Sequence, residues 1–319
     1  MNFIIKFFIL LFFISCEKDE IPINPHQSGK INTEQVGMGA NYRYQVFYNL
    51  KNNNITSTNL KNDWDLGFES QKKGWRVIIN SSLFSKISIV ENTDFEDVTS
   101  SVNLNWNYDN PSGNLDSTAI GDYRDKNNVY VLDRGYSLSG NPVGYKKLRI
   151  DSVTSDYYKI KYANLDNTNL QEIKIYKNNN LNFTSFSFKN DSLASFEPFF
   201  ENWDLVFTQY THLFEDGTAY LVTGVLSNYI QNTEVAIDSL NNFFDINYQM
   251  VENYIFSSKK DKIGYNWKEY DLDNGQYTVF SNISYIVKTQ ENRFFKLRFI
   301  DFYNNLGETG YPTFEVQEL

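Results

Sequence analysis

Cysteine is almost absent from this chain. Cys16 is the only cysteine among 319 residues, which excludes an intramolecular disulfide. The small exported domains that depend on disulfides therefore offer no model for this protein. Its fold must be held together by a hydrophobic core, and the chain is long enough to build one.

Long hydrophobic runs are missing as well. The longest apolar run covers residues 7–14, directly after Lys6. Such a run is too short to cross a hydrocarbon core of ~30 Å as a helix. A positive charge followed by a short apolar stretch is typical of a secretory signal peptide, which we expect at residues 1–15.

The predicted signal peptide leads into Phe13-Ile14-Ser15-Cys16, which resembles the bacterial lipobox. In that motif the cysteine receives the lipid and becomes the mature N-terminus. We therefore predict lipidation at Cys16; the alternative is an ordinary signal peptide followed by an accidental cysteine. Residues 17–20, EKDE, resemble the acidic export signal of Bacteroidetes lipoproteins. This predicts a lipid anchor in the outer membrane, with the protein facing the cell exterior.

The residues that follow contain little that could pack. Pro22 and Pro25 fall in a polar stretch, and we expect residues 16–33 to form a flexible tether.

Positive charge is in deficit. The 29 Lys and Arg residues are outnumbered by 39 Asp and Glu residues, giving a formal net charge of -10. An acidic body lacks the electrostatic footprint of a nucleic-acid-binding protein. It does not favour an anionic bilayer surface either, so we expect the lipid to provide the attachment.

Aromatic residues are plentiful, with 23 Tyr and 26 Phe, and these residue types favour strands. Residues 157–162 and 294–299 alternate apolar and charged side chains, which indicates strands with one solvated face. Turn signals such as Asp216-Gly217 and Asn274-Gly275 separate the runs. The sequence predicts an all-β fold of antiparallel, sandwich-like sheets. A single helical turn is expected, near residues 235–244.

Three patterns occur twice in the same order. Residues 63–68, DWDLGF, return as NWDLVF at 202–207; Gly144-Tyr145 returns as Gly264-Tyr265; and residues 157–162 resemble residues 294–299. We interpret this as two related β-units in tandem, residues 34–185 and 186–319. A single larger sandwich made from both halves is the alternative.

Ordered segments of the second half carry a family resemblance. They read NWDLVFTQY at 202–210, YLVTGVL at 220–226, IGYNWK at 263–268, FKLRF at 295–299 and GYPTFE at 310–315. Together they resemble the HmuY family of Bacteroidetes surface lipoproteins. The resemblance implies an all-β fold and capture of heme for a TonB-dependent outer-membrane receptor.

The resemblance also implies heme iron held by pairs of His and Met side chains. The chain has two histidines, and His26 falls in the predicted tether. His212 is therefore the first candidate ligand, and Tyr210 and Phe214 would flank the porphyrin from the same strand face. Met38 and Met250 are the further candidate metal ligands. The competing interpretation of His212 is a surface residue without a ligand.

We therefore predict a cell-surface binding lipoprotein that captures heme or a related small ligand for an outer-membrane transporter. We predict no enzymatic activity, because motifs such as GYSLS at 135–139 lack the final glycine of a nucleophile elbow. One alternative is a non-heme interaction or accessory lipoprotein of such a transporter. Another is a surface glycan-binding protein that uses Trp75, Trp106 and Trp267 as stacking platforms.

The lipid anchor is open to a direct test. Replacing Cys16 with Ala should release the mature protein into soluble fractions, because the acidic body has no membrane affinity of its own. Cell fractionation and intact-mass analysis check this. If the variant sediments with membranes as fully as the wild type, the anchor lies elsewhere.

Overall fold

The computed structural model describes residues 27–319. The predicted signal peptide, Cys16, His26 and most of the predicted tether lie outside the described residues, so lipidation stays a prediction. The described part contains twenty strands and six short 3-10 helices, which confirms the all-β prediction. No helix within it is long and apolar enough to cross a membrane.

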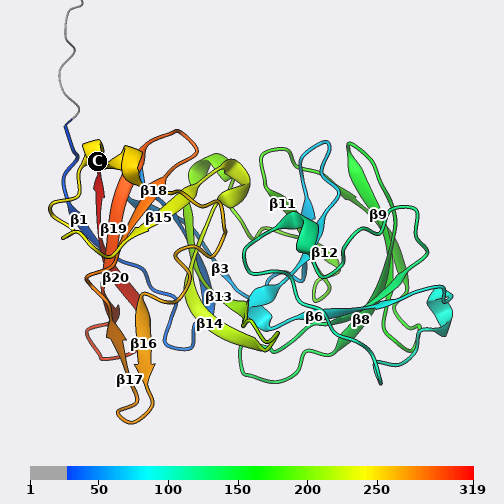
Figure 1. Ribbon diagram of the computed structural model, residues 1–319. Helices are drawn as coiled ribbons and strands as arrows, with labels where there is room; N and C mark the ends of the chain where they lie inside the picture. The colour runs from blue at the N-terminus through cyan, green and yellow to red at the C-terminus, as the bar shows by residue number, and fades with distance from the viewer. Residues whose placement is uncertain (1–26) are drawn as a thin grey trace, which may run out of the picture.

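Most of the strands form two β-sandwiches that lie side by side (Figure 1). In the first sandwich one sheet has the order β12 (Ser192–Ala194), β11 (Phe183–Ser187), β4 (Leu66–Glu69) and β5 (Val77–Ile79). The other has the order β10 (Gln171–Tyr176), β9 (Tyr157–Ala163), β8 (Tyr145–Val153), β7 (Val129–Asp133) and β6 (Lys86–Val90).

The second sandwich has the same plan. One sheet has the order β3 (Asn54–Leu60), β2 (Tyr44–Asn49), β13 (Leu205–Leu213) and β14 (Ala219–Ser227). The other has the order β1 (Asn32–Gln35), β20 (Thr309–Glu318), β19 (Phe294–Tyr303), β18 (Ser284–Lys288) and β15 (Glu234–Asp238). A separate hairpin, β16 (Lys268–Asp271) and β17 (Gln276–Val279), joins β15 to β18 in sequence.

Aromatic side chains fill both cores because alternate strand residues point inward. In the second sandwich the rings of Trp267 and Phe299 stack with centroids 4.0 Å apart, and those of Phe207 and Phe314 with centroids 5.4 Å apart. In the first, Phe68 packs on Tyr158 across the two sheets. Each sandwich therefore has a core of its own.

The strand pairing corrects the predicted boundaries at 34–185 and 186–319. Strands β1, β2 and β3 belong to the second sandwich: β1 pairs with β20, and β2 pairs with β13. The first sandwich thus comprises strands β4 to β12, and the second is completed by the N-terminal strands. The physical reason is that the chain's first strands fill the sheet positions that β10, β11 and β12 occupy in the first sandwich.

The same pairing shortens the predicted tether. Gly29 N donates to Glu318 O at 2.8 Å, and β1 begins at Asn32 within the range expected to be flexible. The helical turn expected near residues 235–244 is also absent from the structure. Those residues form β15, and the Asp238 side chain then accepts hydrogen bonds from Leu240 N and Asn241 N, which ends the strand in a turn.

The repeated Trp-Asp segments occupy equivalent positions. Asp65 Oδ2 accepts from Phe188 N at 2.7 Å, and Asp204 Oδ2 accepts from Leu50 N at 2.8 Å. A buried asparagine then crosslinks each segment: Asn80 Nδ2 donates to Trp64 O, and Asn228 Nδ2 donates to Trp203 O. The structure therefore supports an internal duplication.

The repeat proposed between residues 157–162 and 294–299 is wrong in register. In the sheet orders β9 corresponds to β20, and β8 corresponds to β19. The equivalent segments are KKLRI at 146–150 and FKLRF at 295–299. The lysines at the shared position make equivalent hydrogen bonds. Lys147 Nζ donates to Phe95 O and Val98 O. Lys296 Nζ donates to Phe243 O and Ile246 O. Each ammonium anchors the loop that follows the first edge strand.

Candidate functional site

The predicted aromatic site lies at the end of β13. His212 packs edge-on against Phe214 and Tyr265, with ring centroids 5.2 and 5.1 Å away. Its Nδ1 is buried without a hydrogen-bond partner among the described residues. Phe214 is 44% exposed, whereas Tyr210 is buried and lines a cavity between the sandwiches. The structure thus brings His212 and Phe214 together but turns Tyr210 inward.

The two candidate methionines lie in different environments. Met38 is fully buried in the core of the second sandwich, where no ligand could reach its sulfur. Met250 is part of the short 3-10 helix η6 (Tyr248–Asn253) and lines an open surface pocket. Met250 is therefore the methionine that a bound molecule could contact.

The pocket beside Met250, which we call the loop pocket, has a volume of about 540 Å³. Its apolar walls include Ile237, Leu240 and Ile255, and Lys262 contributes a cation. Leu240 is 94% exposed and Ile255 is 90% exposed. Pockets that bind small molecules commonly have volumes of roughly 300–1,000 Å³ and mostly apolar walls.

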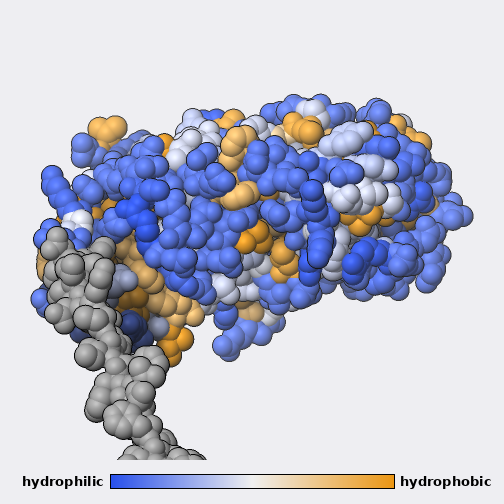
Figure 2. Space-filling view, turned by 90° about the horizontal axis from the view of Figure 1, so that it is seen from above, coloured by the Kyte–Doolittle hydropathy of each residue, from blue (hydrophilic) through white to orange (hydrophobic). Residues whose placement is uncertain are grey.

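The exposed apolar side chains of the loop pocket lie in a surface that is otherwise mostly polar. Figure 2 views the molecule from the end that carries η6 in Figure 1, and shows a mostly hydrophilic surface interrupted by small hydrophobic clusters. Exposed apolar groups rimmed by polar residues are typical of interaction sites. The loop pocket has this character.

Buried polar groups hold the loop pocket in shape. Asp238 accepts hydrogen bonds from Tyr254 Oη at 2.5 Å and Asn241 Nδ2 at 2.8 Å. Burial acts to raise the pKa of Asp238, but these hydrogen bonds lower it overall. From below, Lys296 Nζ donates to the carbonyls of Phe243 and Ile246, both at 2.7 Å. The loop between β15 and η6 is therefore fixed at both ends.

The donor chemistry of the loop pocket suits heme. A methionine thioether is an established axial ligand of heme iron, and Met250 offers one beside apolar walls. The Lys262 ammonium could pair with a ligand carboxylate. Within residues 27–319 no group of three or more His, Cys, Asp or Glu side chains is placed to hold a metal ion.

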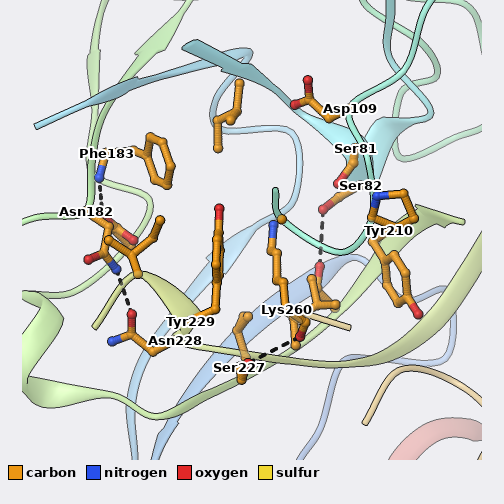
Figure 3. Close-up of a pocket in the computed structure, with 18 of the residues that line it drawn as sticks. Ser81, Ser82, Asp109, Asn182, Phe183, Tyr210, Ser227, Asn228, Tyr229 and Lys260 are labelled. Atoms are coloured by element: carbon orange, nitrogen blue, oxygen red, sulfur yellow. Dashed lines mark hydrogen bonds between the residues drawn. The ribbon is translucent and has the colours of Figure 1, made fainter. Parts of the chain in front are cut away.

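A second cavity lies between the two sandwiches and is much smaller, about 70 Å³ (Figure 3). We call it the inter-sandwich cavity. It is lined by five titratable side chains, Asp109, Glu197, Tyr210, Tyr229 and Lys260. Burial raises the pKa of Asp109 to about 6 and that of Glu197 to about 8, although backbone hydrogen bonds act in the opposite direction. Burial also lowers the pKa of Lys260.

The tryptophans expected to stack on glycans are not free platforms. Trp267 is fully buried in the core, which corrects that expectation. The guanidinium carbons of Arg76 and Arg124 lie 4.5 and 3.8 Å from the Trp75 ring centroid. Trp106 stacks on Tyr145 and is approached by Lys86. The geometry gives the glycan-binding alternative no support.

Sequence reasoning missed most of these residues. Leu240 and Ile255 carry no sequence signal, because nothing in the neighbouring residues marks an apolar side chain as exposed. Asp109, Glu197 and Lys260 come from three distant segments, and no sequence spacing connects them. Met250 was found because the family resemblance directed attention to methionine.

Comparison with known proteins decides the family. The chain matches the HmuY protein family over residues 41–316. The chain belongs to the HmuY family. This confirms the resemblance drawn from the sequence, and the proteins of this family are binding proteins. No match was found among curated proteins.

Two solved structures align with most of this chain at low identity. Apo PinO from Porphyromonas gingivitis is 9% identical, with a TM-score of 0.38, and the alignment covers 91% of this chain and 97% of PinO. The apo HmuY analog TFO from Tannerella forsythia is 10% identical, with a TM-score of 0.34, covering 92% of this HmuY-family chain and 98% of TFO.

The raised pKa of Glu197 predicts a pH dependence of stability. The folded state keeps the Glu197 proton between the ordinary pKa of 4.5 and about 8, so the unfolded state binds fewer protons there. Stability should therefore fall as pH rises through this window. The Glu197→Gln variant should have the same melting temperature as the wild type at pH 4. At pH 9 its melting temperature should be higher than that of the wild type.

Thermal unfolding followed by circular dichroism at pH 4–9 checks this. The exposed Glu201 on the neighbouring helix η4 (Phe200–Asn202) gives the control, since Glu201→Gln should retain the wild-type pH profile. Parallel profiles for Glu197→Gln and the wild type would contradict the assignment.

Proposed function

We propose that this HmuY-family chain captures heme at the cell surface and presents it to an outer-membrane transporter. One observation carries the proposal: Met250 lines an open pocket of about 540 Å³ with exposed apolar walls. The chain belongs to the HmuY family, and the resemblance to that family implies heme capture. The porphyrin would lie against Leu240 and Ile255.

The proposed site uses this chain's own side chains in three roles. Met250 supplies the sulfur that would contact the iron. Leu240, Ile237 and Ile255 exclude water from the ring faces. Lys262 offsets one of the ligand's carboxylates, which matters because the body is acidic.

The lipid anchor and the transporter complete the proposal. Lipidation at Cys16 would hold the protein on the outer membrane, and residues 17–33 would span the gap to the folded body. A TonB-dependent receptor is the proposed recipient of the ligand. Both statements rest on the sequence motifs and on family membership.

A titration with ferric heme tests the function. The wild-type protein should shift and sharpen the Soret band in a saturable way. Met250→Leu keeps the apolar volume but removes the sulfur. It should weaken binding at least about tenfold, the loss typical even when a supporting residue of a metal site is removed.

His212→Ala is the matched control, because His212 lies at the end of β13 and not in the loop pocket. It should leave the spectrum of the complex unchanged. An unaltered heme spectrum at saturating wild-type protein would point to a non-heme interaction lipoprotein. A band shift lost in His212→Ala but kept in Met250→Leu would move the ligand to the aromatic site.

A further inference from the structure

The inter-sandwich cavity is built around one lysine that enters it from a fixed backbone. Lys260 N donates to Ser112 O at 2.7 Å, and Lys260 O accepts from Ser227 N at 2.8 Å. Both sandwiches thus hold the Lys260 main chain. Figure 3 shows its side chain pointing into the cavity beside the Tyr229 hydroxyl, with Asp109 on the opposite side.

The backbone keeps the opposite charges of the cavity apart. The two Asp109 carboxylate oxygens accept from Ile79 N and Ala119 N, each at 2.8 Å. Glu197 Oε1 accepts from Phe183 N at 2.7 Å. Among the described residues, the ammonium of Lys260 forms no ion pair with either carboxylate. A space between an ammonium and two fixed carboxyl groups is left for a third molecule.

A hydrogen-bond donor in the wall of the cavity lacks an acceptor within the described part of the chain. Trp203 is 6% exposed and lines the cavity, and its Nε1 has no partner among the residues described. The side chain of Lys260 lines the same cavity. Leaving a buried donor unpaired costs about 1–3 kcal/mol. An occupant that accepts hydrogen bonds would recover this energy.

Size and charge limit what the occupant can be. A cavity of about 150 Å³ accommodates benzene, which has six heavy atoms, so the 70 Å³ found here suits a molecule of about three heavy atoms. The wall cannot yield easily at Gly113, where a Cβ would lie 2.7 Å from Tyr229 Cζ and 2.8 Å from Lys260 Cβ. Burying a further net charge would be costly, so the occupant must be neutral overall.

We infer that the inter-sandwich cavity binds a small neutral molecule ending in a carboxamide or an undissociated carboxyl group. Its carbonyl oxygen accepts from Lys260 and Tyr229, and its N–H or O–H end donates to Asp109 and Glu197. This site is separate from the loop pocket and does not depend on heme binding. It gives the junction of the two sandwiches a ligand of its own.

Formamide is the probe, because it has three heavy atoms and both hydrogen-bonding ends. Saturation-transfer NMR and titration of protein amide shifts should show saturable binding to the full wild-type chain. Tyr229→Phe removes only the hydroxyl and should weaken binding about tenfold. Lys260→Met, which keeps the length of the side chain, should weaken it at least as much.

Tyr220→Phe is the matched control, since Tyr220 is 61% exposed on β14 and lies outside the cavity lining. It should bind formamide like the wild type, and all three variants should keep the wild-type response to heme. Absence of formamide binding to the wild type would overturn the inference. So would equal binding by Tyr229→Phe, or tighter binding of ethylammonium, which would indicate a cation site formed by the carboxylates.

Discussion

Pairing of the chain's first strands with strands of its second half is the constraint on which this structure depends. Strand β2 adds to β13, and the contact is reinforced where Asp204 N donates to Tyr48 O and Asp204 Oδ2 accepts from Leu50 N. Without it the second sandwich would lose half of one sheet, including Val46 and Tyr48 of its core. The inter-sandwich cavity is lined in part by these two strands, through Phe47 of β2 and Tyr210 of β13.

Duplication explains why the two sandwiches share anchors but not surfaces. Lys147 and Lys296 hold equivalent loops through paired carbonyl contacts. In the first copy Leu104 and Trp106 pack against the buried cluster that contains Phe95. In the second copy Leu240 and Ile255 stay exposed beside Met250. The same scaffold therefore carries a closed loop in one unit and an open pocket in the other, which is where a ligand would bind.

The local features of this fold could be predicted from the sequence, and the distant ones could not. Aromatic alternation and the repeated Trp-Asp segments pointed to strands and to duplication, because both are properties of neighbouring residues. The closure of β2 on β13 joins residues far apart in the chain, and no local pattern encodes it. For the same reason Met38 and Met250 looked alike, although one fills the core and the other lines a pocket. The inter-sandwich cavity draws on segments near residues 109, 197 and 260, which only the fold brings together.

A circular permutant tests this architecture most directly. The chain would start at the exposed Ser195, run to Leu319, join residue 27 through a linker and end at Ala194. A short linker is enough, because Gly29 and Glu318 are joined by a backbone hydrogen bond of 2.8 Å. Each sandwich would then be continuous in sequence with every strand pair kept. Near-UV circular dichroism should show a cooperative transition within about 5 °C of the unpermuted chain of residues 27–319. Loss of that transition would contradict the assignment of the N-terminal strands to the second sandwich.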